Sequence, residues 1–134
     1  MPESNNIQLL ITNSTNVPMC VYHRAIAYDY NGKKKVIHNT YGGIEIIDFD
    51  NFCRERHIYR TKHYPLLKPL NTRQIVEQHA APFHPITNNC EDLTSDILNE
   101  YTPHHCLCRS PQRLFWITIT ILATIILIYK LTHK

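Results

Sequence analysis

Short runs of hydrophobic residues, several of them alternating with polar ones, fill the first half of the chain and predict strands. Five such runs are separated by turn residues and lie at 7–11, 17–30, 33–39, 44–47 and 58–62. Between the second and third run stands Asn31-Gly32, the strongest short hairpin signal. The pattern therefore predicts a small antiparallel sheet.

The second half changes to helical spacing. Asp48 is expected to cap a short helix through Arg54, and Asn71 a second helix to about Ala80. Asn88 or Asn89 begins a third helix. Its apolar stripe is Leu93, Ile97 and Leu98, and it runs to about Tyr101, before Pro103. Strands followed by helices of this kind predict an α+β domain.

The C-terminal segment is apolar on every face. Residues 114–129 carry no charge and span about 24 Å as a helix, somewhat short of a ~30 Å hydrocarbon core. Leu131 extends the span if Lys130 snorkels, and Trp116 and Tyr129 stand where an aromatic belt is expected. A buried core helix is the alternative, but few residues follow that could cover it. We therefore predict a transmembrane tail anchor over 114–131.

This anchor divides the chain into a domain over 1–102, a juxtamembrane linker over 103–113 and the membrane segment. The polar start of the sequence carries no secretory signal, so the domain is expected in the cytosol. The short span suits a thin membrane, such as the endoplasmic reticulum or another intracellular membrane. Positive charge is similar on both sides of the span and does not itself fix the orientation.

Composition narrows the possible partners. With 134 residues, there is room for one domain and a tail, and a net charge of +3 is too mild to argue for nucleic acid. Five cysteines, an odd number, in a chain without a signal sequence favour a reduced domain over a disulfide scaffold.

Cys90 is the first candidate for chemistry. It follows Asn88-Asn89, in the predicted first turn of a helix, where free backbone N–H groups and the helix dipole favour a thiolate. A thiolate is the nucleophilic form of cysteine. The alternative is a small buried hydrophobe beneath a helix cap.

Two histidines on one predicted hairpin are the second candidate. His23 and His38 lie on either side of Asn31-Gly32, and a bulge in the pairing would bring them together. If the helix of Cys90 packs on this hairpin, a thiol, an imidazole and a third polar group meet, as nucleophilic acyl transfer requires.

The same residues resemble a known family. The run 23–28 (HRAIAY), a turn containing glycine and Val36-Ile37-His38 resemble one motif of the lecithin:retinol acyltransferase family, and Asn89-Cys90-Glu91 resembles another. The similarity covers about residues 17–101, in the same order, and the family includes phospholipase A/acyltransferases with a C-terminal hydrophobic anchor. It implies a permuted papain-like fold, related to NlpC-type peptidases.

The resemblance also implies roles. Cys90 would be the nucleophile, His23 the general base and then the acid, and His38 the group that orients His23. The substrate would be a glycerophospholipid ester, and the acyl group on Cys90 would pass to water, an amine or a lysolipid hydroxyl. The implied partners are a phospholipid membrane and its lipids; protein partners are not indicated, and no metal or other cofactor is required.

Three positions depart from the family pattern. Arg24 stands where the family has an aromatic residue, the turn between the histidines is longer, and Asp92-Leu93 replace His-Phe after the cysteine motif. The longer turn separates the two histidines by fifteen positions. These changes affect substrate entry, strand pairing and the charge near Cys90.

Other readings remain open. His104, His105, Cys106 and Cys108 are possible zinc ligands, although Cys106 and Cys108 fit reversible palmitoylation better, and a plain linker is a third alternative. Cys20 and Cys53 are expected to be buried thiols. As a whole, the chain is alternatively a non-enzymatic, membrane-tethered interaction module that retains the fold, or a cysteine peptidase or amidase of the same superfamily.

Overall fold

A five-stranded antiparallel sheet forms the centre of the domain. The structure, a computed structural model, describes residues 5–82, 84, 89–104 and 111–134, except 14–21. The strands are adjacent in the order β4-β3-β2-β1-β5. Their bounds are β1 Asn6–Asn13, β2 Tyr22–Tyr30, β3 Lys33–Thr40, β4 Gly43–Asp48 and β5 Ile58–Pro65. The α+β class and the antiparallel sheet predicted from the sequence are confirmed.

Two tight turns fix the register of the central strands. Asn31 and Gly32 have φ angles of 50° and 75°, the left-handed pair that a two-residue hairpin turn requires. The β2–β3 pairing runs from Tyr30–Lys33 to Ile26–Ile37 without a recorded shift. The next hairpin pairs Thr40 with Gly43, which has a φ of 104°.

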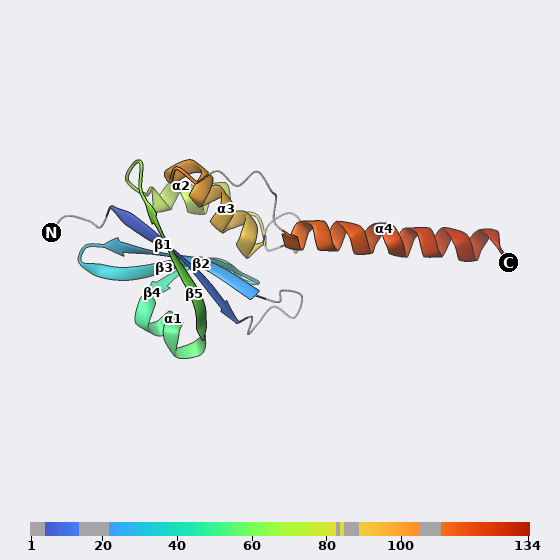
Figure 1. Ribbon diagram of the computed structural model, residues 1–134, viewed down its shortest axis with the longest axis horizontal. Helices are drawn as coiled ribbons and strands as arrows, with labels where there is room; N and C mark the ends of the chain where they lie inside the picture. Colours follow the sequence, from blue (N-terminus) through green and yellow to red (C-terminus); the bar gives the residue numbers. More distant parts are fainter. Residues whose placement is uncertain (1–4, 14–21, 83, 85–88, 105–110) are drawn as a thin grey trace.

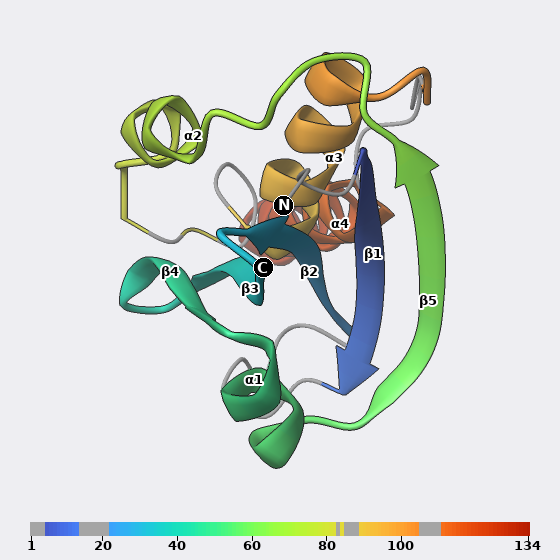
Figure 2. The same ribbon diagram turned by 90° about the vertical axis from the view of Figure 1, so that its left-hand side faces the viewer.

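Helices cover both faces of the sheet (Figures 1 and 2). α1 (Phe49–Glu55) lies on one face, and α2 (Thr72–Gln78) and α3 (Cys90–Tyr101) lie on the other. The α3 side buries Ile7, Leu9, Ile26, Tyr28, Ile37, Ile75, Leu93, Ile97, Leu98 and Tyr101. The α1 side buries Leu10, Ala25, Ala27, Val36 and Phe52.

The alternation along β2 decides which residues enter which core. Ile26 belongs to the α3 side, whereas Ala25 and Ala27 belong to the α1 side. His23 continues the alanine row, and its ring contacts Phe52 of α1 at 6.4 Å between centroids. The polar histidine thus enters a largely apolar layer, where its hydrogen bonds gain strength from the low dielectric.

α4 (Pro111–Thr132) is a helix of 22 residues that stands apart from the sheet (Figure 1). Its segment Phe115–Thr132 has a mean hydropathy of 1.9, and none of it is buried against the rest of the chain. At 1.5 Å per residue the whole helix is ~33 Å long, enough to cross a ~30 Å hydrocarbon core. By length and composition, α4 is able to span a membrane. It begins at Pro111, inside the predicted linker.

Several local predictions need correction. Asp48 precedes α1 but makes no capping hydrogen bond, because its carboxylate binds Lys35 on the neighbouring strand at 2.6 Å. Cys53 is half-buried, since it lies on the outer side of α1. Residues 17–21 of the predicted second strand, with Cys20, lie outside the described residues.

Candidate active site

The first turn of α3 is held by a complete capping box. The Asn89 side chain accepts hydrogen bonds from the backbone N–H groups of Glu91 and Asp92, both at 3.0 Å. In return, the Asp92 carboxylate accepts from the Asn89 N–H at 3.1 Å. Asp92, one of the departures from the family pattern, therefore has a structural role here. The cap fixes the backbone on which Cys90 stands.

Cys90 is the first residue of α3, as the sequence predicted, and forms no disulfide with the other described cysteines. α3 packs against β2 and β3, the strands that carry His23 and His38, but on the face opposite the α1 layer in which both histidine rings contact Phe52. The side chain of Cys90 is 1% exposed. Among the described residues, no hydrogen bond joins Cys90 to either histidine.

His23 and His38 form a direct pair. The Nε2 atom of His23 lies 2.8 Å from Nδ1 of His38, and the rings meet edge to face. The paired register of β2 and β3 ends at Ile26–Ile37, before it reaches the histidines, so the predicted bulge stays a prediction. Both rings contact Phe52 of α1, which places them on the same face of the sheet.

Glu45 extends this pair, and the sequence analysis missed it. Its Oε2 atom lies 3.0 Å from Nε2 of His38. The sequence of the second hairpin could have identified Glu45. A two-residue turn at Tyr41-Gly42 places Glu45 of β4 directly opposite His38 of β3. A carboxylate at that position faces the imidazole.

The chain of three groups sets the histidine tautomers. Because the Glu45 carboxylate only accepts, Nε2 of His38 donates to it, and Nδ1 of His38 is then an acceptor. Nε2 of His23 donates to that acceptor, which leaves the lone pair of His23 on Nδ1. This Nδ1 is buried and has no hydrogen-bond partner among the described residues. Of the ring nitrogens in the pair, this is the one whose lone pair is open to accept a proton.

Burial keeps both rings neutral. Desolvation, followed by the charges of Arg56 and His38, lowers the pKa of His23 from 6.5 to about 3. Desolvation and Arg56 also lower the pKa of His38, although Glu45 partly opposes them. At neutral pH both rings are therefore neutral, and a pKa of about 3 makes His23 a weaker base than an ordinary histidine.

Arg56 is the second residue that sequence reasoning missed. It follows α1, is 9% exposed and lies over the ring of Phe52 at 5.5 Å. Its guanidinium donates to the Asn13 carbonyl at 3.2 Å. Arg56 also interacts electrostatically with Cys90, and this interaction raises the arginine pKa while desolvation lowers it. Nothing in the local sequence identifies it, because its neighbours come from distant segments.

Access to the site is restricted. His23 and His38 are 1% and 2% exposed. A hollow of about 280 Å³ reaches the pair from the side of His38, Glu45, Phe52 and Arg56. Any substrate that reaches Cys90 must therefore displace side chains that now cover it.

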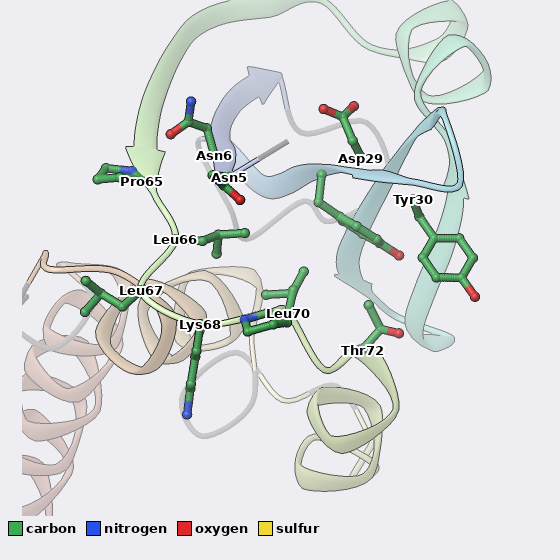
Figure 3. Close-up of a pocket in the computed structure, with 12 residues that line it drawn as sticks. Asn5, Asn6, Asp29, Tyr30, Pro65, Leu66, Leu67, Lys68, Leu70 and Thr72 are labelled. Atoms are coloured by element: carbon green, nitrogen blue, oxygen red, sulfur yellow. The ribbon is translucent and has the colours of Figure 1, made fainter. Parts of the chain in front are cut away.

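A different hollow, of about 400 Å³, lies at the other end of β2 (Figure 3). It is formed by the start of β1, by Asp29 and Tyr30, and by the segment from Pro65 to Thr72. Lys68 is the positively charged residue among those lining it, and it also pairs with Glu100 at 3.2 Å. This hollow contains no nucleophilic thiol and no histidine.

The possible zinc ligands are only partly described. His104 contacts the Tyr64 ring at 5.1 Å, while His105, Cys106 and Cys108 lie outside the described residues. In the parts of the chain that the structure describes, no group of three or more His, Cys, Asp or Glu residues is arranged to hold a metal ion.

No protein-family model matches the chain, and no curated protein or solved structure matches it.

Proposed function

We propose that the protein is a membrane-anchored thiol acyltransferase or phospholipase A that acts on glycerophospholipids. The observation that carries the proposal is the hydrogen-bonded chain from the exposed Glu45 carboxylate through the buried rings of His38 and His23, which leaves a lone pair on Nδ1 of His23. Cys90 supports it, at the capped start of a helix that packs on the same two strands. We assign the domain to the lecithin:retinol acyltransferase type of permuted papain-like fold, in the order histidine, histidine, cysteine.

In the first half-reaction, Nδ1 of His23 takes the thiol proton of Cys90. The thiolate attacks the ester carbonyl carbon, and the C–O bond to the glycerol breaks. The leaving alkoxide takes the proton back from His23, so a lysolipid departs and the acyl group remains on Cys90 as a thioester. His38 and Glu45 hold the His23 ring and stabilise the positive charge that it carries transiently.

In the second half-reaction, His23 removes a proton from water, an amine or a lysolipid hydroxyl. The new nucleophile attacks the thioester carbonyl, the C–S bond breaks, and the proton returns to the sulfur of Cys90. Water yields a free fatty acid, and the other acceptors yield an acylated lipid. Ping-pong kinetics follow from the covalent intermediate.

The membrane segment supports a lipid substrate. An anchored enzyme meets its substrate in two dimensions, which raises the effective concentration of the lipid. We place the domain in the cytosol, with α4 crossing the endoplasmic reticulum or another intracellular membrane. A glycosylation site appended after Lys134 tests this topology: modification of the site supports it, and a site that stays unmodified although α4 is inserted contradicts it.

The direct test is to trap the acyl-enzyme. Full-length protein in nanodiscs is incubated with phosphatidylcholine carrying a radiolabelled acyl chain, beside Cys90→Ala and His23→Ala. Wild type acquires a hydroxylamine-sensitive label and releases fatty acid or N-acyl lipid, and both variants lose these products. Cys53→Ala is the matched control. It keeps the label, because burial and the Asp50 carboxylate raise the pKa of the Cys53 thiol and disfavour its nucleophilic form.

Three results would contradict the proposal. A folded, membrane-inserted wild type that forms no acyl-enzyme favours the non-enzymatic interaction module. Label that persists in Cys90→Ala assigns the chemistry to another residue. Release from peptides, with none from lipid, favours the cysteine peptidase or amidase.

A further inference from the structure

A third pocket lies on the α3 side of the sheet, beside the first turn of α3. It has a volume of about 570 Å³, and we call it the arginine pocket. Its lining residues come from β1, β2, β5 and the first turn of α3, and they are Ile11, Tyr22, Arg24, Tyr59, Arg60 and Glu91. The proposed mechanism assigns no role to any of them.

The sheet register brings the two arginines to opposite sides of one apolar residue. Ile11 pairs with Arg24 on β2 and with Arg60 on β5. Paired residues on adjacent antiparallel strands point to the same face, and two strand spacings separate the arginines by ~10 Å. Side chains as long as arginine are able to converge on one small anion across this distance.

The charges in the pocket are not balanced. Arg24 and Arg60 face a single carboxylate, Glu91, and the nearest approach of Arg24 to Glu91 is a loose 3.9 Å. Among the described residues, Arg60 has no ion-pair partner. Arginine recognises phosphate through a planar set of donors, so an excess of arginine in a concave site favours a phosphate group.

Aromatic and aliphatic surface completes the pocket. The rings of Tyr22 and Tyr59 meet edge to face, with centroids 6.1 Å apart, and both are more than half exposed. Together with Ile11 they offer apolar contact beside the two cations. The lining therefore matches a ligand that joins a phosphate to hydrocarbon.

In the sequence, two residues of the arginine pocket directly follow the proposed reacting residues. Arg24 directly follows His23, and Glu91 directly follows Cys90. Consecutive Cα atoms are 3.8 Å apart, so the same two backbone segments carry both sites. Arg24 is also where this sequence departs from the aromatic residue of the family it resembles.

We propose that the arginine pocket binds the phosphate of an acyl-bearing phospholipid and so positions its ester toward Cys90. The part of this inference that concerns catalysis, the positioning of the ester toward Cys90, rests on the proposed function. The binding step itself is independent of chemistry, and it is tested separately.

Binding is measured by titrating dihexanoyl phosphatidic acid into full-length Cys90→Ala in neutral dodecylmaltoside micelles, by isothermal titration calorimetry. Arg24→Gln and Arg60→Gln are each expected to weaken binding about tenfold, the loss of roughly one charge-assisted contact. Arg54→Gln, an exposed arginine of α1 on the other face, is the matched control and leaves the affinity unchanged. Circular dichroism and thermal unfolding confirm that each variant is folded.

Two further ligands define what is recognised. Dihexanoylglycerol, which lacks the phosphate, should bind at least tenfold more weakly than dihexanoyl phosphatidic acid, and inorganic phosphate, which lacks the hydrocarbon, should also bind more weakly. The proposal is overturned if phosphatidic acid does not bind, if neither arginine variant changes its affinity, or if Arg54→Gln weakens it equally. If a ligand with acyl chains and the same charge, but a carboxylate in place of the phosphate, binds as tightly as phosphatidic acid, the pocket does not recognise phosphate.

The kinetic consequence distinguishes the two proposals. In active protein, Arg24→Gln and Arg60→Gln should raise KM for phosphatidic acid about tenfold and leave kcat/KM for dihexanoylglycerol unchanged. Phosphate-dependent binding without any turnover would refute the proposed function and leave the pocket assignment standing. If the protein turns over its substrates and neither arginine substitution changes the kinetic constants, the pocket assignment is refuted and the proposed function stands.

Discussion

At the scale of single residues, two buried histidines and one exposed glutamate on three neighbouring strands give this domain its candidate chemistry. His23, His38 and Glu45 form one hydrogen-bonded chain across β2, β3 and β4. The ionised Glu45 carboxylate can only accept a hydrogen bond, and this fixes the donor-to-acceptor direction of the whole chain of hydrogen bonds. One acidic side chain at the edge of the sheet thus decides which nitrogen of a buried imidazole carries the lone pair.

Glu45→Ala should therefore lower kcat by roughly tenfold or more, within the range that general bases contribute. Without the carboxylate, the His38 tautomer is no longer fixed, and a fraction of His23 carries its proton on Nδ1. Nitrogen-15 NMR of the histidine rings reports this tautomer change directly. Glu55→Ala, which alters an exposed carboxylate lining the same hollow, is the control. Unchanged tautomers and unchanged kcat in Glu45→Ala would contradict this role.

The buried histidines should also make stability depend on pH. Unfolded His23 binds a proton near its ordinary pKa of 6.5, whereas the folded protein resists protonation until about pH 3. Because the unfolded state binds more protons between these values, the free energy of unfolding falls as pH falls below 6.5, by up to ~1.4 kcal/mol per pH unit.

This pH dependence is measured by urea unfolding of the full-length protein in detergent at pH 7, 6 and 5. His23→Asn should flatten the slope. His57→Asn, which removes an exposed histidine, should not. Parallel slopes in wild type and His23→Asn would contradict the assignment.

At the scale of elements, α3 carries the nucleophile because its first turn is capped and buried. Asn89 is fully buried and accepts two backbone hydrogen bonds, whereas the Asn71 cap of α2 accepts one, from Gln74 at 3.1 Å. α2 lies further from the sheet and carries none of the candidate residues. The two caps thus offer a comparison within one chain.

Asn89→Ala should cost about 2 kcal/mol, the upper part of the range for cap removal, because it leaves two N–H groups without their acceptor at a buried helix end. Asn71→Ala should cost about 0.5–1 kcal/mol. Both are measured as changes in the urea midpoint at constant slope. Acyl-enzyme formation should decrease in Asn89→Ala alone. Equal costs for the two substitutions would show that burial of the cap has little energetic weight.

At the scale of the whole molecule, the chain joins a compact sheet domain to an unburied apolar helix. No part of the Phe115–Thr132 segment is buried by the rest of the protein, so its apolar side chains need a membrane or another partner to cover them. The function proposed here depends on that partner being the lipid bilayer.

Leu122→Arg should prevent stable insertion, because an arginine at the centre of a spanning helix costs about 2.5–3.5 kcal/mol. Leu131→Arg makes the same exchange near the end of α4, where the side chain snorkels to the interface, and should remain inserted. Resistance to alkaline carbonate extraction reports the difference. Extraction of wild type, or equal resistance in both variants, would contradict a spanning helix.

The sequence by itself determined the local features. Hairpin positions followed from Asn31-Gly32, strand faces from the alternation of residues 23–28, and the start of α3 from its asparagine cap. These depend on hydrogen bonds and side-chain direction within a few residues, which neighbouring positions encode. The same reasoning selected His23, His38 and Cys90, two of which the structure joins directly.

Only the tertiary structure decided which distant segments meet. It joined the two histidine rings by a hydrogen bond, brought Arg56 from beyond α1 close enough to lower their pKa values, and placed Arg60 across Ile11 from Arg24. It also set the pKa of His23, because desolvation depends on everything packed around the ring. Such effects arise from packing between segments that are distant in the sequence. Strand order and helix placement contribute to this packing as much as any single residue does.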